Sequence, residues 1–397
     1  MKPSENGPLR IAMLGHKRVP SREGGIEVVV GELSRRMAAL GHRVTLFNRS
    51  GSHVGGAEFA TADRTLHEYE GVEIRWAPAI DKRGLAALTG AMSASVMALP
   101  GGFDIVHYHA EGPSIMCWLP KLFGKKVVVT VHGLDHRRGK WGKIAKTVIL
   151  RGERNAARWA DAVIVLSEDV RRYFRETYGR ETALIPNGTA PAERRAARLI
   201  TEKYGLAENS YLLFLGRLVP EKGLDCLIEA FRRTGIEKKL VIAGSGSDSG
   251  GYVQRLHTLA AGDGRILFTG FVQGETLEEL YSNAYLYLLP SRLEGMPLSL
   301  LEAMSYGNCC VTSDIPECTD VTGDAAFSFP MDDTRALAAL LERLCAEPET
   351  VERYKAGAAG YICSRYSWDA VTEQTLKLYR RVLAGEKIGR WSGEVSV

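Results

Sequence analysis

Short apolar runs alternate along this chain with longer amphipathic stretches, which is the pattern of a parallel β-sheet covered by helices. The first apolar run, Leu9–Leu14, is followed by a glycine-bearing loop and by a helical pattern from about Gly25 to Leu40. Gly41 stands just past this helix, where a left-handed residue often ends a helix. Further strands are predicted at residues 43–47, 105–108, 126–131, 162–166 and 182–185.

The alternation of strands and helices then starts again near residue 210. The apolar run Ser210–Leu215 precedes a loop and a helical pattern at Gly223–Thr234. Further strands are predicted at residues 239–243, 266–269, 284–289 and 308–312. Because 397 residues exceed the size of one ordinary domain, we expect two doubly wound, Rossmann-like α/β domains.

The expected domain boundary lies near residue 190. Residues 1–190 form the predicted N-terminal domain and 191–365 the predicted C-terminal domain, and the charged segment 188–209 is the candidate linker. Two such domains imply a cleft between them. Ligands of parallel sheets bind beyond the carboxyl ends of the strands, so residues that follow strands are the candidate site residues.

The composition is that of a soluble globular protein, with 45% hydrophobic and 25% charged residues. The seven cysteines form no Cys-x-x-Cys pair, which argues against a zinc site and a disulfide framework and favours a reducing cytoplasm. The opening MKPSENGPLR lacks the apolar core of a signal peptide. Residues 84–103 carry no charge, but glycine, serine and proline dilute them, so we predict a buried helix ending near Pro100 rather than a membrane span.

The positive charge of the chain is concentrated in one segment. Residues 1–190 hold 28 Lys and Arg against 19 Asp and Glu, and most of this excess lies in 121–160, with 11 basic and two acidic residues. Such a segment suits an anionic membrane or acceptor, or is simply a solvated helix face. We expect a cytoplasmic protein, with peripheral contact at the inner membrane face as the open alternative. No nucleic-acid-binding motif accompanies the basic segment.

The strongest candidate constellation runs from Glu294 to Glu302. It follows the predicted strand 284–289, and Pro297 suits the first turn of a helix. A helix starting there would direct its N–H groups and its positive end at a diphosphate. The two carboxylates suit sugar and ribose hydroxyls, although a lone Glu302 is equally an ordinary surface residue.

A second constellation, residues 216–223, follows the predicted strand 210–215. Arg217 supplies a planar fork and Lys222 a point charge, two ways of holding phosphate oxygens. Gly216 permits close approach of the backbone. The alternative is that these cations form a surface salt bridge with Glu221. This alternative is less favoured, because the loop lies between a strand and the start of a helix.

Two further motifs follow strands of the N-terminal half. The Gly24-Gly25 pair precedes a helix and suits an anion or an acceptor. The loop is not G-x-G-x-x-G, and Asn48 stands where a dinucleotide-binding enzyme needs an acidic residue, so the dehydrogenase fingerprint is absent. His132, beside Gly133 at a strand end, is predicted to bond the donor sugar or to stabilise charge on it.

Weaker motifs follow other strands. For each of them a structural role and a functional role are about equally favoured. Gly244 and Val272 could approach the nucleotide, and His109 and Glu111 could meet the acceptor. Asn187 could line the cleft or simply belong to a turn.

In chain order, Gly24-Gly25, His132-Gly133, the segment Gly-Arg-x-x-x-Glu-Lys-Gly and the two glutamates eight positions apart resemble glycosyltransferase family 4, the retaining enzymes of the GT-B fold. The resemblance covers nearly the whole chain, and the N-terminal part further resembles enzymes of bacterial surface-polysaccharide assembly. It implies two Rossmann-like domains that face a central cleft. It also implies that residues 366–397, opened by Tyr366-Ser367-Trp368, form a last helix that packs on the N-terminal domain.

The resemblance implies metal-independent, retaining transfer of a hexose from a nucleoside-diphosphate sugar to a saccharide or lipid-linked acceptor, with no cofactor. Arg217 and Lys222 would bind the diphosphate, Glu302 the ribose and Glu294 the sugar. His132 would lie near the transferred sugar. Gly295 to Leu298 would offer backbone N–H groups, although Gly295 stands where many relatives carry a bulky residue.

The candidate set is therefore His132, Arg217, Lys222 and Glu294 for catalysis, Gly24, Gly25, Gly216, Gly244, Val272, Gly295, Met296, Pro297, Leu298 and Glu302 for donor binding, and His109, Glu111 and Asn187 for the acceptor, with no metal ligand. Two alternatives stay open. A sugar-nucleotide epimerase of the same fold would convert the donor without an acceptor. A catalytically idle protein would bind nucleotide sugars only, but charges buried in a cleft are costly without a ligand.

Overall fold

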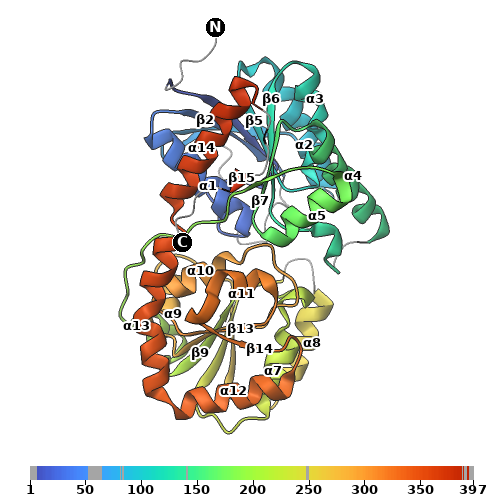
Figure 1. Ribbon diagram of the computed structural model, residues 1–397. Coiled ribbons are helices and arrows are strands. Elements are labelled where there is room, and N and C mark those ends of the chain that lie inside the picture. Colours follow the sequence, from blue (N-terminus) through green and yellow to red (C-terminus); the bar gives the residue numbers. More distant parts are fainter. Residues whose placement is uncertain are drawn as a thin grey trace. The chain divides into compact units, whose positions relative to one another are not determined.

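The computed structural model describes residues 7–51, 65–80, 82, 85–139, 142–246, 250–386, 388 and 391–392. The chain divides into two compact α/β units, each a sheet with helices packed against it (Figure 1). Unit 1 comprises residues 1–188 and 368–397, and unit 2 comprises residues 189–367. The division therefore falls within two residues of the expected boundary.

Unit 1 contains a sheet of nine described strands in the order β15-β8-β7-β6-β5-β1-β2-β4-β3, parallel except for the β3–β4 pair. Its strands are β1 (Arg10–Leu14), β2 (Arg43–Arg49), β3 (Glu68–Tyr69), β4 (Val72–Ala77), β5 (Ile105–His109), β6 (Lys126–Val131), β7 (Ala162–Val165), β8 (Ala183–Leu184) and β15 (Trp391–Ser392). Its helices are α1 (Gly25–Ala39), α2 (Leu85–Ala98), α3 (Trp118–Leu122), α4 (Lys143–Trp159), α5 (Glu168–Tyr178) and α14 (Trp368–Ala384), with the short turns η3 (Leu99–Gly101), η4 (Pro113–Met116) and η5 (Asp135–Arg137).

Unit 2 contains a sheet in the order β11-β10-β9-β12-β13-β14, with every pair parallel. Its strands are β9 (Tyr211–Leu215), β10 (Lys239–Ala243), β11 (Ile266–Gly270), β12 (Leu286–Leu289), β13 (Cys310–Ser313) and β14 (Phe327–Phe329). Its helices are α6 (Leu199–Tyr204), α7 (Leu224–Arg232), α8 (Gly250–Ala260), α9 (Glu275–Asn283), α10 (Leu298–Ser305), α11 (Pro316–Thr322), α12 (Thr334–Ala346) and α13 (Pro348–Arg365), with η6 (Pro220–Lys222) and η7 (Gly323–Ala325).

Each predicted strand overlaps an observed one, which confirms the α/β pattern read from the sequence. The bounds of β6 and β10 agree with the prediction, because both are continuous apolar runs buried on two faces of a parallel sheet. The strands β3, β4, β14 and β15 were not predicted, and three of them, β3, β14 and β15, are very short. Two or three residues carry too little periodicity to be recognised.

The uncharged stretch near residue 90 forms α2, but the prediction of a buried helix is wrong for one of its faces. Ala91, Ala94 and Ala98 are buried, whereas the side chain of Val96 is 56% exposed. No helix among the described residues is long and apolar enough to cross a membrane.

The expected linker at 188–209 is also wrong, because most of this segment is part of unit 2. It contains α6, whose first N–H groups are bonded by a distant carboxylate. The fully buried Glu279 of α9 accepts hydrogen bonds from the backbone N–H of Arg198 and Ile200, each at 3.0 Å. The side chains of Arg195 and Arg198 also donate to Glu278 and Glu275 of α9, at 3.1 and 3.0 Å, so charges of the segment help to tie it to unit 2.

The last described helix, α14, belongs to unit 1 (Figure 1). The hydroxyl of Tyr379 lies 2.6 Å from Nδ1 of His107 in β5, and Arg36 of α1 donates to Asp369 at 2.9 Å. These contacts hold α14 against β5 and α1 of unit 1.

Candidate functional site

The loops after β9, β10, β11 and β12 lie at one edge of the sheet of unit 2, because these strands are parallel. They carry the residues predicted to bind the donor: Gly216, Arg217, Lys222, Gly244, Val272, Glu294, Gly295, Met296, Pro297, Leu298 and Glu302. The residues Gly24, Gly25 and His132 follow β1 and β6 at the corresponding edge of the sheet of unit 1. The fold therefore gathers the predicted residues at two carboxyl edges, one in each unit.

Two glycines bring the loops of unit 2 into direct backbone contact. Gly223 has φ +65°, and a Cβ there would lie 2.0 Å from the carbonyl oxygen of Pro290. Gly244 has φ +144°, and a Cβ there would lie 1.8 Å from the carbonyl oxygen of Gly216. Any side chain at either position would separate these loops. Gly223 and Gly244 are thus required by packing.

Lys222 and Glu294 form an ion pair at this edge. Nζ of Lys222 lies 2.5 Å from Oε1 of Glu294, and the side chains are only 12% and 9% exposed. The hydroxyl of Ser291 donates to the same oxygen at 2.6 Å. Lys222 was predicted to bind the diphosphate and Glu294 to bind the sugar, so the two residues were expected to act separately. Their contact places a cation and a hydroxyl-binding carboxylate side by side.

Arg217 is half-buried in the loop after β9 and forms no ion pair or side-chain hydrogen bond with the described residues. The alternative of a salt bridge between this loop's cations and Glu221 is therefore not observed. Both carboxylate oxygens of Glu221 are buried without a hydrogen-bond partner among the described residues. No described residue occupies the guanidinium donors of Arg217, and these donors suit a bound anion.

The helix α10 begins at Leu298, one residue later than predicted. Pro297 occupies the N-cap, with φ −76° and ψ 102°, and so precedes the first turn. Pro297 also has no N–H, so the expectation that it donates a backbone hydrogen bond is wrong. The N–H groups of this segment belong to Gly295, Met296, Leu298 and Ser299. No acidic residue in the first turn offsets the positive end of α10.

Glu302 is the fifth residue of α10 and is half-buried. The hydroxyl of Tyr281 donates to its Oε2 at 3.3 Å. This contact orients the carboxylate, a group whose oxygens accept hydrogen bonds.

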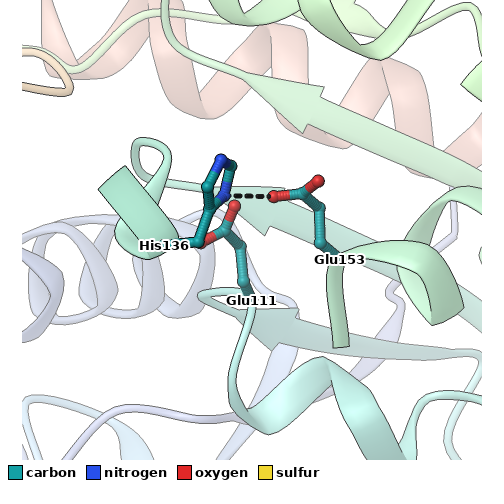
Figure 2. A group of neighbouring side chains, drawn as sticks. All are labelled: Glu111, His136 and Glu153. Atoms are coloured by element: carbon teal, nitrogen blue, oxygen red, sulfur yellow. Dashed lines mark hydrogen bonds and ion pairs between the residues drawn. The ribbon is translucent and has the colours of Figure 1, made fainter. Parts of the chain in front are cut away.

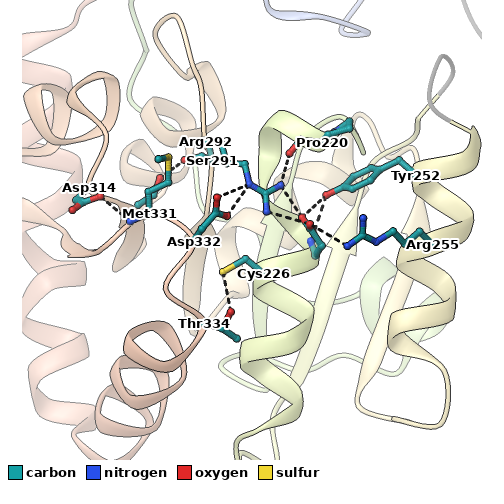
Figure 3. A network of polar contacts seen from close by, with 12 residues as sticks. Pro220, Cys226, Tyr252, Arg255, Ser291, Arg292, Asp314, Met331, Asp332 and Thr334 are labelled. Atoms are coloured by element: carbon teal, nitrogen blue, oxygen red, sulfur yellow. Dashed lines mark hydrogen bonds and ion pairs between the residues drawn. The ribbon is translucent and has the colours of Figure 1, made fainter. Parts of the chain in front are cut away.

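Arg292 is a residue of this edge that the sequence analysis missed (Figure 3). Its Nη1 and Nη2 donate to the two carboxylate oxygens of Asp225 in α7, at 2.9 and 3.1 Å. Its Nε lies 2.7 and 2.9 Å from the oxygens of Asp332. Partial burial alone would raise the pKa of Asp225. The hydrogen bond from Arg292 outweighs this effect and holds the pKa below its ordinary value.

The same arginine also joins the two loops of the site. Nη1 of Arg292 donates to the carbonyl oxygen of Pro220 at 2.8 Å. The backbone N–H of Arg292 donates to the carbonyl oxygen of Glu221, also at 2.8 Å. Arg292 thus fastens the loop that carries Glu294 to the loop that carries Lys222. Nothing in the local sequence identifies its partners, since Asp225 lies 67 positions away.

His132 follows β6 in unit 1 and contacts a second histidine. Its Nε2 lies 3.1 Å from Nδ1 of His109, and burial lowers the pKa of His132 to about 4. The imidazole is therefore neutral near pH 7. A neutral imidazole can form a hydrogen bond to a sugar, and this remains the role predicted for His132.

The three residues predicted to meet the acceptor are all buried: His109, Glu111 and Asn187. His109 is the last residue of β5 and stacks between the imidazoles of His107 and His132. Glu111 lies in a separate polar cluster described below. Because these side chains are enclosed by protein, their burial argues against direct contact with an acceptor.

Gly24 and Gly25 begin α1, with Gly24 at the N-cap and Gly25 exposed. Glu27 lies in the first turn and accepts a hydrogen bond from the backbone N–H of Lys17 at 2.8 Å. Its carboxylate offsets part of the positive helix end. The N-terminus of α10 is accordingly the more favourable of the two for an anion.

Comparisons with known proteins find relatives for both halves of the chain. The family model described as Glycosyltransferase Family 4 matches residues 23–193, and the model described as Glycosyl transferases group 1 matches residues 198–361. The chain is 28% identical over 298 residues to α-D-kanosaminyltransferase of Streptomyces kanamyceticus, covering 70% of this chain and 77% of that protein.

Two solved structures show the same fold. Sucrose-phosphate synthase of Thermosynechococcus elongatus is similar with a TM-score of 0.78 and 21% identity, covering 95% of this chain and 100% of that one. Anabaena HepE in complex with UDP-glucose is similar with a TM-score of 0.76 and 18% identity, covering 93% and 99%. From the family models, the motifs and the fold together, the chain belongs to the family 4 glycosyltransferases and consists of the two Rossmann-like domains of the GT-B fold.

Proposed function

We propose that this chain transfers a hexose, with retention of the anomeric configuration, from a nucleoside-diphosphate sugar to a saccharide or lipid-linked acceptor in polysaccharide or glycoconjugate assembly. Membership of the family supports a nucleotide-sugar donor, and the similar HepE was solved with UDP-glucose. The single observation that carries the proposal is the Lys222–Glu294 pair beside the N-terminus of α10.

The donor's diphosphate and sugar require different chemistry, and unit 2 supplies both at one edge. Arg217 and Lys222 provide positive charge for the diphosphate, and the first N–H groups of α10 add donors aimed at the same anion. Glu294 accepts hydrogen bonds from sugar hydroxyls, and Glu302 does so from the ribose. We assign these roles on the positions of the four side chains.

Transfer breaks the bond between the anomeric carbon and the leaving phosphate oxygen. Negative charge then grows on the diphosphate, and fixed cations that are already in place stabilise it without reorganisation. The acceptor oxygen bonds to the anomeric carbon on the face that the phosphate leaves, and its proton passes to the phosphate. No side chain acts as a nucleophile in this route. The neutral His132 is assigned a hydrogen bond to the transferred sugar.

The proposal is tested by incubating the full-length protein with UDP-, GDP-, ADP- and dTDP-glucose and with candidate saccharide and lipid-linked acceptors. We expect acceptor-dependent release of one nucleoside diphosphate, and an α-linked product by NMR from the α-linked donor. A β-linked product would contradict retention. Conversion of the donor into an isomeric sugar nucleotide without an acceptor would indicate the epimerase instead, which the glycosyltransferase relatives do not favour.

The basic segment supports a further part of the proposal, an acceptor reached at an anionic membrane surface. The outward residues of α4 include Lys143, Arg151 and Arg154, which form no ion pair with the described residues. Between them, Ile144 is 85% exposed and Leu150 is also exposed. Positive charge interleaved with exposed apolar side chains suits contact with anionic lipid headgroups.

The full-length protein should therefore sediment with vesicles of phosphatidylcholine and phosphatidylglycerol at low salt but not with phosphatidylcholine alone. High salt should weaken the binding, since it screens exposed charges. The double variant Arg151→Gln/Arg154→Gln should lose most of the binding. The matched control Arg233→Gln/Arg335→Gln removes two exposed charges from unit 2 and should retain it. Equal loss in both variants would show that net charge alone is responsible and would remove the assignment to α4.

A further inference from the structure

A second cluster of polar side chains lies in unit 1, apart from the residues assigned to the donor. Glu111 follows β5, His136 lies in η5 and Glu153 lies in α4 (Figure 2). One possible ligand atom from each residue lies within 4.8 Å of the other two. Nδ1 of His136 is 3.0 Å from Oε2 of Glu153, and both carboxyl groups are fully buried. Three elements distant in sequence thus converge on one point.

The close packing of α4 explains this convergence. Gly152 precedes Glu153, and a Cβ at Gly152 would lie 1.9 Å from the carbonyl oxygen of Glu111. Only glycine allows the helix to approach the chain after β5 so closely. As a result, two carboxyl groups are held together in the interior of unit 1.

The outer oxygen of each carboxyl group is already held by the protein. The hydroxyls of Tyr173 and Tyr178 donate to Oε1 of Glu153 at 2.8 and 2.5 Å. The backbone N–H of Asp135 donates to Oε2 of Glu111 at 2.8 Å, whereas Oε1 of Glu111 is buried and has no hydrogen-bond partner among the residues that the structure describes. Metal-binding carboxylates are commonly oriented by outer donors of this kind.

Two adjacent buried carboxyl groups need a positive charge between them, which a proton or a metal ion can supply. Burial, together with Glu153, raises the pKa of Glu111 well above its ordinary value, so the proton is the competing occupant. Imidazole and carboxylate together are ligands suited to zinc and similar divalent ions.

We propose that Glu111, His136 and Glu153 bind a divalent transition-metal ion of the Zn²⁺ class. The ion would tie the segment 132–138, which begins with His132, to α4. Its role is structural, and no step of the transfer passes through it. The absence of paired cysteines in the sequence does not bear on this cluster, because its three residues include no cysteine.

The test is titration of chelator-treated full-length protein with ZnCl₂ by calorimetry. We expect one equivalent to bind the wild type and to raise its melting temperature. Glu111→Gln and His136→Gln should each weaken binding at least about tenfold, since even outer-shell partners of a metal are worth that much. The control variants His67→Gln and Glu68→Gln change exposed residues of the same unit and should bind as the wild type does.

Glu111→Gln also distinguishes a bound metal ion from a bound proton as the occupant of the cluster. Glutamine has the shape of a protonated glutamate, so the variant should preserve the fold. Co²⁺ provides a second readout, since its absorption spectrum distinguishes nitrogen and oxygen ligands from cysteine thiolates. Absence of stoichiometric binding would overturn the proposal and assign the cluster to a shared proton. Binding that survives both variants, or a thiolate spectrum, would also overturn it by placing the ion elsewhere.

Discussion

Replacing Lys222 by alanine will lower the turnover of the donor by about 10²- to 10³-fold, the usual effect of removing one preorganised group from a site of developing charge. Lys222 is the cation in contact with Glu294, and the proposed mechanism requires it to stabilise the leaving diphosphate. The measurement is kcat for nucleoside diphosphate release. Lys203→Ala, which removes a lysine of α6 in the same unit, serves as the control and should leave kcat unchanged.

Loss of stability must be separated from loss of catalysis in this variant. The pair is largely buried, so Lys222→Ala leaves Glu294 without its cation and should lower the free energy of unfolding by about 3 kcal/mol. The double variant Lys222→Ala/Glu294→Gln removes the unpaired charge and should recover most of that stability without recovering turnover. Wild-type turnover in a folded Lys222→Ala protein would contradict the role assigned to Lys222.

The second large effect is expected from Arg292→Ala. Arg292 joins the loop of Glu294 to the loop of Lys222, so its loss should displace the two groups relative to each other. Displacement of about 1 Å in a site can reduce the rate about 10²-fold. We therefore expect kcat to fall by about that factor, with a smaller change in the apparent KM. Steady-state kinetics with the cognate donor measure both quantities.

The control for Arg292 is a neighbouring arginine that contacts the same carboxylate. Arg255 lies 3.8 Å from Asp225 but is mostly exposed, and among the described residues it forms no hydrogen bond or ion pair with either loop of the site. Arg255→Ala should change kcat little, since exposed ion pairs contribute about 1 kcal/mol or less. Arg292→Lys keeps the charge without the planar fork and should recover only part of the rate. Equal effects of Arg255→Ala and Arg292→Ala would show that only the charge near Asp225 matters.

The sequence predicts the fold of this protein better than its site. Buried strands such as β6 and β10 are continuous apolar runs, so their positions follow from local pattern. Lys222 and Glu294 were identified because each follows a strand within a motif. Their contact was not predicted, since 72 positions separate them and only the assembled sheet brings them together.

Burial accounts for most of what the sequence could not show. The neutral state of His132 depends on surrounding atoms from β5 and β6, which its neighbours in sequence do not reveal. The charged segment after residue 188 was taken for a linker because its partner Glu279 lies some 80 positions away. Arg292 looked like an ordinary loop residue for the same reason. Long-range polar contacts carry no local signal, and they decide the geometry of the site.

Binding of the donor's nucleotide tests the central claim most directly. The melting temperature of the full-length protein is measured with millimolar UDP, GDP, ADP, dTDP, CMP and NAD, and a ligand at 100 times its Kd stabilises the folded protein by about 2.7 kcal/mol. We predict a clear increase with one nucleoside diphosphate, and a smaller increase with the same nucleotide in Lys222→Ala. An increase with NAD alone, or none with any nucleoside diphosphate, would contradict a nucleotide-sugar site at this edge of unit 2.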